Sequence, residues 1–241
     1  MTRSEINGII EKAVKFLERQ NFKLPPFAFW GPKDWVQKGN ETDEIVKCML
    51  GWDITDFGSA DFKKIGLVMF TVRNGHMKNP KYSHKPYCEK ILISEEEQIT
   101  PMHFHWNKVE DIINRAGGNL VIQFYNSTRT EGLSDKDIAV SVDGVCKTIK
   151  AGETIVLSPG ESVCIPARLY HKFWGEKSRG TVLIVEVSKI NDDTIDNRFH
   201  EKTGRFPAIE EDVPQQYLLF SEYQKYRRIK GSSAESMGHG Q

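Results

Sequence analysis

The feature that most restricts the fold of this chain is residues 101–110, a stretch that contains two histidines and a glutamate. His103 and His105 are two residues apart, so both imidazoles project from one face if the stretch is a β-strand. Glu110 follows after room for a turn that can bring its carboxylate back toward the rings. Two imidazole nitrogens and a carboxylate suit a divalent transition metal such as Mn, Fe, Co or Zn. The plainer interpretation is a pair of strand histidines beside an exposed glutamate, but His171, from a second strand-rich part, favours a metal site.

Short strand-like segments recur from residue 65 onward and are separated by turn residues. In the second of them, alternation places Lys90 on one face with Cys88 and Leu92. Many short strands at near-regular spacing indicate a sandwich or a closed barrel. The predicted strands are 65–72, 87–93, the metal stretch itself, 119–126, 138–142, 145–149, 154–157, 162–165, 169–174 and 181–188, with a tight turn at Asp143 and Gly144.

The residue patterns near both ends of the chain do not indicate strands, in contrast to the strand-rich middle. Residues 3–20 are predicted to form an amphipathic helix on the outside of the domain, with Thr2 and Glu5 as a capping box. We therefore expect four parts: 1–62 as this helix and a covering segment with a short helix near 41–50, 63–190 as the β-barrel, 191–230 as an extension with a helix at 217–228, and 231–241 as a disordered tail.

Composition narrows the class of protein. Lys+Arg and Asp+Glu both number 33, so the formal net charge is zero and no basic face argues for a nucleic-acid partner. We find no membrane-length apolar run and no signal-peptide core, and predict a cytoplasmic protein without a membrane partner. The four cysteines show no CxxC spacing; three lie in apolar strand-like surroundings, where free buried thiols are expected. A homodimer is the commonest state for such an enzyme, and exposed strands would offer an edge to pair.

The spacing of these residues resembles the cupin superfamily. The pattern His103-x-His105-x4-Glu110-x6-Gly117 is similar to the first cupin motif, and Gly160-x5-Pro166 followed by His171 is similar to the second. Arg168 and Gly175 depart from the second motif, which has glycine and asparagine there. The resemblance implies an all-β fold, a jelly-roll-like double-stranded β-barrel with peripheral N- and C-terminal helices. It also implies a single metal held by His103, His105, Glu110 and His171.

A more specific resemblance covers nearly the whole chain. The runs 101–106, 110–115, 117–119, 158–162, 170–174, 186–188 and 191–193, with the N-terminal helix and segment 24–27, resemble the bacterial D-lyxose isomerase family. This resemblance implies Mn²⁺ as the preferred activator, although such a site admits other divalent transition metals. It implies D-lyxose and D-xylulose as substrates, with D-mannose and D-fructose as slower ones.

The chemistry expected of such a site is aldose–ketose exchange. A metal polarises the sugar carbonyl, and a base moves a proton between C1 and C2 through an enediol-like intermediate. A hydride shift between the two carbons is the alternative, and the sequence does not distinguish the two mechanisms. Glu110 and Glu186 are candidate bases, and Lys90 is a candidate for stabilising the enediolate oxygen. Lys90, Asp193 and Arg205 are candidates for binding sugar hydroxyls, the last two alternatively being solvated surface charges. His76, His84, His200 and His239 are expected to be surface or structural.

Two other classes of function fit the same motifs. A cupin oxidoreductase, either a dioxygenase or an oxalate-type enzyme, can use three histidines and a glutamate but needs O₂. A non-catalytic sugar-binding cupin is the other alternative, and the intact four-ligand set argues against it.

Overall fold

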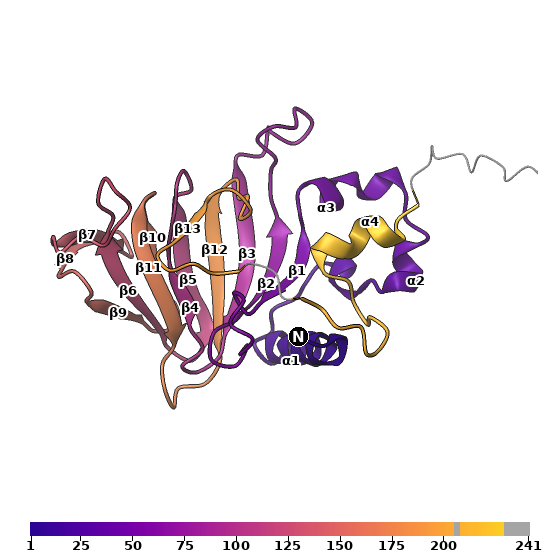
Figure 1. The fold of residues 1–241 in the computed structure, drawn as a ribbon, viewed down its shortest axis with the longest axis horizontal. Helices are drawn as coiled ribbons and strands as arrows, with labels where there is room; N and C mark the ends of the chain where they lie inside the picture. The colour runs from indigo at the N-terminus through magenta and orange to yellow at the C-terminus, as the bar shows by residue number, and fades with distance from the viewer. Residues whose placement is uncertain (205–207, 229–241) are drawn as a thin grey trace, which may run out of the picture.

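The computed structural model describes residues 1–204 and 208–228 (Figure 1). Its helices are α1 (Arg3–Arg19), η1 (Pro26–Phe29), α2 (Pro32–Trp35), η2 (Asn40–Thr42), α3 (Asp43–Lys47), η3 (Phe220–Glu222) and α4 (Tyr223–Tyr226), where η marks a 3₁₀ helix. Its strands are β1 (Gly51–Thr55), β2 (Leu67–Arg73), β3 (Tyr87–Ser94), β4 (Thr100–His105), β5 (Glu110–Gly117), β6 (Leu120–Asn126), β7 (Ile138–Val142), β8 (Val145–Ile149), β9 (Thr154–Leu157), β10 (Ser162–Ile165), β11 (Leu169–Gly175), β12 (Val182–Lys189) and β13 (Asn197–Phe199).

The strands form two antiparallel sheets that face each other. One sheet has the order β1-β2-β3-β12-β5-β10-β7-β8, and the other has the order β13-β4-β11-β6-β9. The prediction of an all-β cupin barrel with peripheral helices is confirmed. The sequence did not predict β1, β5 or β13 as strands, and β1 and β13 lie outside the range 63–190 expected for the barrel. The division into four parts therefore stays a prediction.

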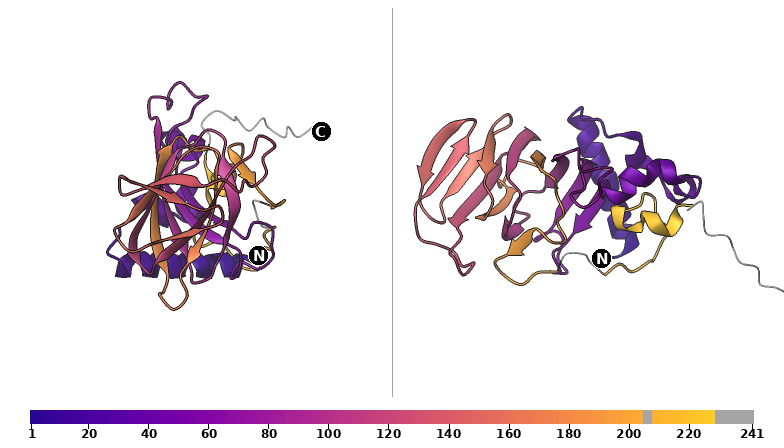
Figure 2. Two further views of the ribbon diagram at one scale, coloured as in Figure 1. Left: turned by 90° about the vertical axis from the view of Figure 1, so that its left-hand side faces the viewer. Right: turned by 90° about the horizontal axis from the view of Figure 1, so that it is seen from above.

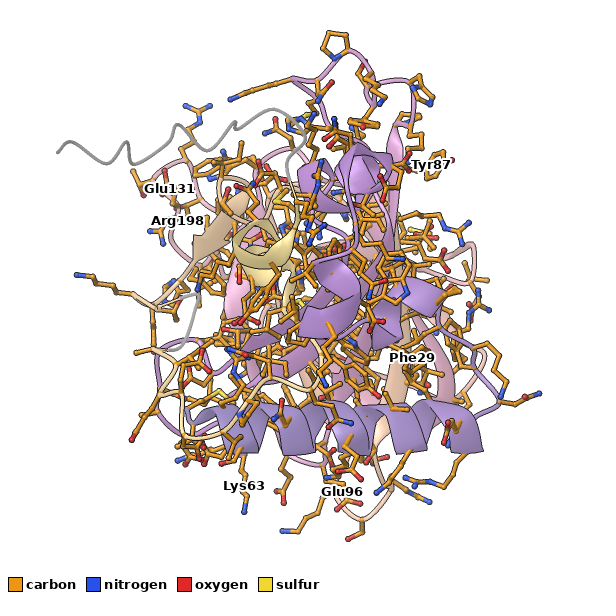
Figure 3. The ribbon with its side chains drawn as sticks, turned by 90° about the vertical axis from the view of Figure 1, so that its right-hand side faces the viewer. Phe29, Lys63, Tyr87, Glu96, Glu131 and Arg198 are labelled. Carbon is orange, nitrogen blue, oxygen red and sulfur yellow. The ribbon has the colours of Figure 1, made fainter. Side chains whose placement is uncertain are left out.

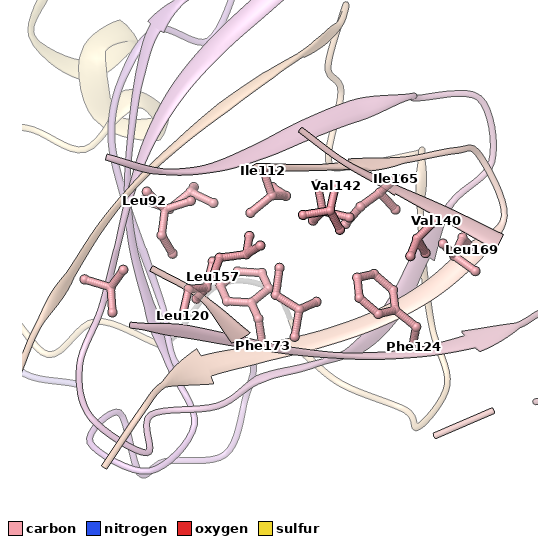
Figure 4. Close-up of a cluster of buried hydrophobic side chains, with 14 of the residues drawn as sticks. Leu92, Ile112, Leu120, Phe124, Val140, Val142, Leu157, Ile165, Leu169 and Phe173 are labelled. Carbon is pink, nitrogen blue, oxygen red and sulfur yellow. The ribbon is translucent and has the colours of Figure 1, made fainter. Parts of the chain in front are cut away.

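A hydrophobic core fills the space between the two sheets (Figure 4). Inward-facing side chains alternate with outward-facing ones along each strand, as the period of two requires. On β2, for example, Leu67 and Met69 face this core, whereas Val68 and Phe70 belong to a second cluster. That second cluster explains why β2 reads as a continuous apolar run, since both of its faces are covered.

Helix α1 provides the cover on the outer face of the larger sheet (Figure 2). Ile6 and Ile10 are fully buried in the same cluster as Phe70. Burial of each isoleucine side chain contributes about 1.5–3 kcal/mol relative to leaving it in water. The predicted capping box is confirmed, because the Thr2 hydroxyl accepts from the Glu5 backbone N–H while the Glu5 carboxylate accepts from the Thr2 N–H.

The C-terminal segment ties α1 down. Arg3 has no exposed side-chain surface, and its guanidinium donates to the carboxylates of Glu211 and Glu222. The amino group of Met1 donates to the carbonyl of Ala208 at 3.1 Å. The start and the end of the described chain are thus joined at one place, although more than two hundred residues separate them.

Several local predictions can be scored against these elements. The short helix near 41–50 is confirmed as α3, and the tight turn between β7 and β8 is confirmed by positive φ angles of 50° at Asp143 and 80° at Gly144. The helix predicted at 217–228 is wrong in extent, because only residues 220–226 are helical, in two short pieces. The tail predicted at 231–241 lies outside the described residues.

The exposure of the cysteine thiols differs in part from the prediction made from the sequence. All four thiols are free. Cys88 is buried on β3 and Cys164 is partly buried, whereas Cys146 is exposed on the edge strand β8. The expectation of a buried thiol is therefore wrong for Cys146. Alternation places Cys146 on the outward face of an edge strand, which explains its exposure. Within the described residues, no helix is long and apolar enough to cross a membrane.

Candidate metal centre

Three imidazoles meet between the sheets, on the inner face of the smaller one. His103 and His105 come from β4, and His171 comes from the neighbouring strand β11, where it pairs directly with His103. One ligand nitrogen from each ring lies within 4.8 Å of the other two. All three side chains are buried. The i, i+2 spacing therefore places both β4 histidines on one face, as the sequence predicted.

The fourth predicted ligand arrives from the opposite sheet. Glu110 is the first residue of β5, which follows β4 after a four-residue loop and crosses to the larger sheet. Its Oε1 lies 3.3 Å from Nε2 of His105 and 3.1 Å from Nε2 of His171. All four ligands predicted from the sequence thus converge.

Hydrogen bonds fix which ring nitrogens face the centre. Nδ1 of His103 lies 2.8 Å from the carbonyl oxygen of Pro101, and Nδ1 of His171 lies 3.1 Å from that of Leu169. Since a carbonyl only accepts, each Nδ1 carries the proton, and Nε2 of a neutral ring presents a lone pair. Burial, followed by the neighbouring rings, holds the pKa of His103 well below its ordinary value, so this ring is neutral near pH 7.

The resulting arrangement suits a cation. Nε2 of His171, the ring nitrogen that is not hydrogen-bonded to the backbone, and Oε1 of Glu110 face each other across 3.1 Å. Oε1 is also buried without a hydrogen-bond donor among the residues described. Lone pairs and negative charge that point at one place are stabilised by a metal ion between them, and the mixed N/O donor set suits a divalent transition metal. The residues present therefore fit the metal that the sequence implied.

A chain of ion pairs extends from this centre along the larger sheet. Lys108 Nζ lies 2.7 Å from Oε2 of Glu110 and 2.8 Å from Oε1 of Glu186. Lys90 Nζ lies 3.9 Å from the same Glu186 oxygen and 2.6 Å from Oδ2 of Asp193. We call these five side chains the ion-pair chain. Each of them is at most 10% exposed, so they are screened little by solvent.

The charges in the ion-pair chain keep Lys90, Lys108 and Glu110 ionised despite burial. Burial alone lowers the pKa of Lys108, but the negative charges of Glu110 and Glu186 outweigh it and the net pKa is raised. Burial raises the pKa of Glu110, but the charge of Lys108 and the interactions with His105 and His171 together outweigh it, and the net pKa lies well below the ordinary value. The pKa of Lys90 is likewise raised, because Asp193 and Glu186 outweigh its desolvation.

Lys108 is the site residue that sequence reasoning missed. It lies in the loop between β4 and β5, and this loop is held by Asp196, whose carboxylate accepts from the backbone N–H groups of Asn107 and Lys108 at 2.9 and 3.0 Å. The available signal was its position between His105 and Glu110, inside the metal stretch itself. A lysine in a turn normally reads as solvated, so this signal was weak.

The other predicted residues divide into three groups. Lys90, Glu186 and Asp193 line the same pocket as the metal centre. Arg205 lies outside the described residues, as does His239. His84 and His200 are exposed and His76 is partly exposed, and none of the three lines this pocket.

The pocket has polar and apolar walls and is closed on one side by β13. Phe199 on β13 stacks beside His103, with ring centroids 5.3 Å apart. Arg198, the neighbouring residue, pairs at 2.7 Å with Glu131 in the loop after β6 (Figure 3). The apolar part of the wall consists of Phe57, Leu67, Met69, Leu92, Ile112, Phe173 and Phe199. Such a mixed wall suits a small ligand that has both C–H and O–H surfaces.

A larger cavity elsewhere in the described structure is not lined by the three histidines of the candidate metal centre. It measures about 680 Å³ between α1 and the outer face of the larger sheet, against about 40 Å³ at the metal centre. Its charged side chains include Lys12 and Glu95, which pair with each other at 2.9 Å near the surface. Convergent ligand atoms and buried charges, rather than volume, therefore make the three-histidine centre the candidate functional site.

The chain is similar to known proteins along nearly its whole length. The family model described as D-lyxose isomerase matches residues 1–223. A D-lyxose/D-mannose isomerase of Serratia proteamaculans is 45% identical over 227 residues, which cover 94% of this chain and 99% of the relative. The D-lyxose/D-mannose isomerase of Escherichia coli O157:H7 is 45% identical over 228 residues, which cover 94% of this chain and all of the relative. Among solved structures, the ligand-free L-ribose isomerase of Cellulomonas parahominis aligns with a TM-score of 0.57 and 14% identity over 87% of this chain and 98% of that one, a likeness in fold.

Proposed function

The chain belongs to the D-lyxose isomerase family and is an aldose–ketose isomerase; from this premise, we propose that it uses a divalent metal ion to interconvert D-lyxose and D-xylulose, and more slowly D-mannose and D-fructose. The observation that carries the metal dependence is the convergence of imidazole lone pairs on a buried carboxylate oxygen without a donor. Manganese is the metal we propose. The second pair of sugars shares the configuration of the first from C1 to C4.

The proposed ligands are His103, His105, Glu110 and His171. When bound, the metal supplies Lewis-acid polarisation of the sugar carbonyl and acidifies the hydrogen on the neighbouring carbon. The hydrogen bonds from Nδ1 to backbone carbonyls hold the rings of His103 and His171 in the orientation that this requires.

We propose Glu186 as the base that transfers the proton between C2 and C1. Both oxygens of Glu110 are already engaged, one facing the histidines and one accepting from Lys108. Glu186 stands outside the ligand set, with its Oε1 held by Lys108 and Ser188. As general base, Glu186 removes the proton from C2 of the aldose, the C–H electrons form the C1=C2 bond, and the C1=O π electrons move onto O1, which takes up a proton to give the enediol. The O2 hydroxyl then loses its proton, C2=O forms, and the C1=C2 electrons take the proton from the Glu186 carboxylic acid at C1.

The two lysines have supporting roles. Lys90 and Lys108 are both held as cations by the carboxylates around them. A buried positive charge stabilises an enediolate oxygen far more than the same charge in water. We propose that Lys90, with Asp193, also binds a sugar hydroxyl at the far end of the ion-pair chain from Glu110. Arg205 stays a predicted hydroxyl ligand.

Two further predictions accompany this function. The cytoplasmic location is supported by four free thiols, which suit a reducing compartment. The homodimer has support only from the exposed edge strand β8.

The experiment is to load metal-free protein with Mn²⁺ and incubate it anaerobically with a panel of pentoses and hexoses in D₂O. Ketose formation from D-lyxose is the expected result, with deuterium at C1 in those turnovers in which the Glu186 carboxylic acid exchanges its proton with the solvent before returning it. Turnover that requires O₂ would support the cupin oxidoreductase alternative instead. If no aldose is converted with any divalent transition metal, the proposed function is wrong.

A further inference from the structure

Two polar atoms that line the metal-centre pocket are enclosed but have no hydrogen-bond partner among the described residues. The Thr100 side chain belongs to a residue only 2% exposed, and its Oγ1 has no hydrogen bond to any described residue. Oδ1 of Asn197 is also enclosed, and it too lacks a donor within the described part of the chain. Leaving such an atom unpaired costs about 1–3 kcal/mol. A buried polar atom that faces a pocket without a partner therefore points to a ligand that supplies one.

A β-bulge aims Thr100 into the pocket. His171 pairs with His103, so regular antiparallel pairing would set Phe173 opposite Pro101. Instead Phe173 pairs with Thr100, because the register shifts by one residue between these two pairs. Phe173 shares the inner face with His171, and its partner Thr100 consequently faces inward as well. Bulges next to active sites redirect side chains in this way.

Asn197 reaches the same pocket from the other end of β4. It is the first residue of β13 and pairs with His105, so its side chain shares the inner face with that ring. Thr100 lies about 10 Å along β4 from His103, on the side opposite to Asn197. The two unpaired atoms thus stand at either side of the three histidines.

The charged groups of the pocket already have partners within the protein. The ion-pair chain on the larger sheet satisfies its own charges, since each lysine binds two carboxylates and each carboxylate binds at least one lysine. The smaller sheet contributes the three proposed ligand rings and, beside them, the two unpaired atoms. Thr100 and Asn197 therefore add uncharged hydrogen-bonding groups to the pocket, outside both the ion-pair chain and the proposed ligand set.

We propose that Thr100 and Asn197 are specificity-determining residues that bind hydroxyl groups of the sugar beyond C1 and C2. This inference rests on the proposed function, which places C1 and C2 at the metal. A hydroxyl can donate to Oδ1 of Asn197, and it can either donate to or accept from Oγ1 of Thr100. A site built to pair with a hydroxyl discriminates strongly against a substrate that lacks it or directs it elsewhere.

The first test replaces Thr100 with valine, which has nearly the same shape but no hydroxyl. For T100V we expect kcat/KM with D-lyxose to fall about 10- to 100-fold, the effect of one lost buried hydrogen bond, while bound Mn²⁺ stays at the wild-type level. T100S, the matched control, keeps the hydroxyl and should retain most of the activity. The melting temperature of substrate-free T100V should equal or exceed that of the wild type, because no internal hydrogen bond is lost. A clearly lower melting temperature, or unchanged kinetics, would show that Thr100 has no such role.

The second test uses the 3-, 4- and 5-deoxy derivatives of D-lyxose. If Thr100 binds one hydroxyl, T100V and the wild type should have the same kcat/KM for the derivative that lacks it, and should differ for the others. Equal penalties with every sugar would refute the assignment for Thr100. N197L, tested in the same way, should lose its penalty with a different derivative, and equal penalties there would refute the assignment for Asn197.

A binding measurement separates this inference from the proposed function. The unreactive sugar alcohols xylitol and D-arabitol should raise the melting temperature of metal-loaded wild type more than that of T100V or N197L. Absence of turnover by the wild type overturns the proposed function. Equal stabilisation of all three proteins by the polyols overturns the hydroxyl-binding role.

Discussion

Glu110 and Glu186 lie on the neighbouring strands β5 and β12 and accept hydrogen bonds from the same ammonium group, that of Lys108. This shared lysine connects a proposed metal ligand to the proposed base. The two carboxylates are both at most 7% exposed, so the positive charge of Lys108 interacts strongly with each of them in a medium of low dielectric. The following predictions test this arrangement and the packing that supports it.

Replacing Lys108 with methionine should destabilise the metal-free protein by about 3–5 kcal/mol, because two buried carboxylates lose their common cation. Urea unfolding of metal-free samples measures the change. K150M is the matched control: Lys150 is 78% exposed in its pair with Asp137, and its loss should cost at most about 1 kcal/mol. Equal effects of the two substitutions would mean that Lys108 does not hold the carboxylates.

Replacing His171 with alanine should remove bound metal and activity while the fold is kept. Elemental analysis and circular dichroism measure the two properties. Removing the metal from the wild type with a chelator should lower its melting temperature, and Mn²⁺ should restore it, because a ligand bound only by the native state stabilises that state. H84A, which alters an exposed histidine outside the pocket, should behave like the wild type. Retained metal and turnover in H171A would contradict the ligand assignment.

Replacing Glu186 with glutamine should preserve metal content and slow turnover about 100-fold or more, because the amide cannot take up the proton. Its carbonyl oxygen can still accept from Lys108, so the melting temperature should change little in comparison with K108M. Steady-state kinetics with D-lyxose measures the effect. Turnover near the wild-type rate would assign the base role to Glu110 or another group.

Replacing Arg3 with methionine should destabilise the protein by about 3–5 kcal/mol, because the buried carboxylate of Glu222 loses its guanidinium partner. The double variant R3M/E222Q should recover part of this loss, since a neutral amide is less costly to bury. Activity of R3M at a temperature where it is folded should equal that of the wild type, as Arg3 lies outside the pocket. A stability change below 1 kcal/mol would contradict the proposed importance of this contact.

The cysteines give a prediction that depends on pH. Burial raises the pKa of Cys88 to about 12, so almost none of it is thiolate at pH 8, whereas Cys146 is exposed. Iodoacetamide should therefore alkylate Cys146 in the native protein and reach Cys88 only after unfolding, as measured by mass spectrometry. Above pH 9 the unfolded thiol of Cys88 ionises while the folded one keeps its proton, so its contribution to stability falls as pH rises. Native alkylation of Cys88 at the rate of Cys146 would contradict this.

The metal centre was largely predictable because strand geometry is simple. Alternation alone places His103 and His105 on one face, and motif spacing identified Glu110 and His171 as their partners. Alternation also placed Lys90 on the face of Leu92, and both line the pocket. These inferences needed only local regularity and one resemblance.

The burial of Lys108 and the orientation of Thr100 could not be predicted, because they depend on contacts between distant parts of the chain. The burial of Lys108 is set by Asp196 and Glu186, which are 88 and 78 residues away. Simple alternation from His103 would turn Thr100 outward, and only the register shift opposite Phe173 turns it inward. Pro101, between Thr100 and the histidines, was the available sign, since a proline inside a strand marks an edge or a bulge.

The joining of the two ends of the chain has a consequence for biosynthesis. Arg3 is synthesised long before its partner Glu222, which follows 219 residues later. Strand β12, which lies in the larger sheet between β3 and β5, is also synthesised well after both of its neighbours. The nascent chain must therefore keep the apolar face of α1 and the open sheet soluble until these segments have emerged from the ribosome, and a ribosome that stalls before residue 182 would leave a fragment prone to aggregation.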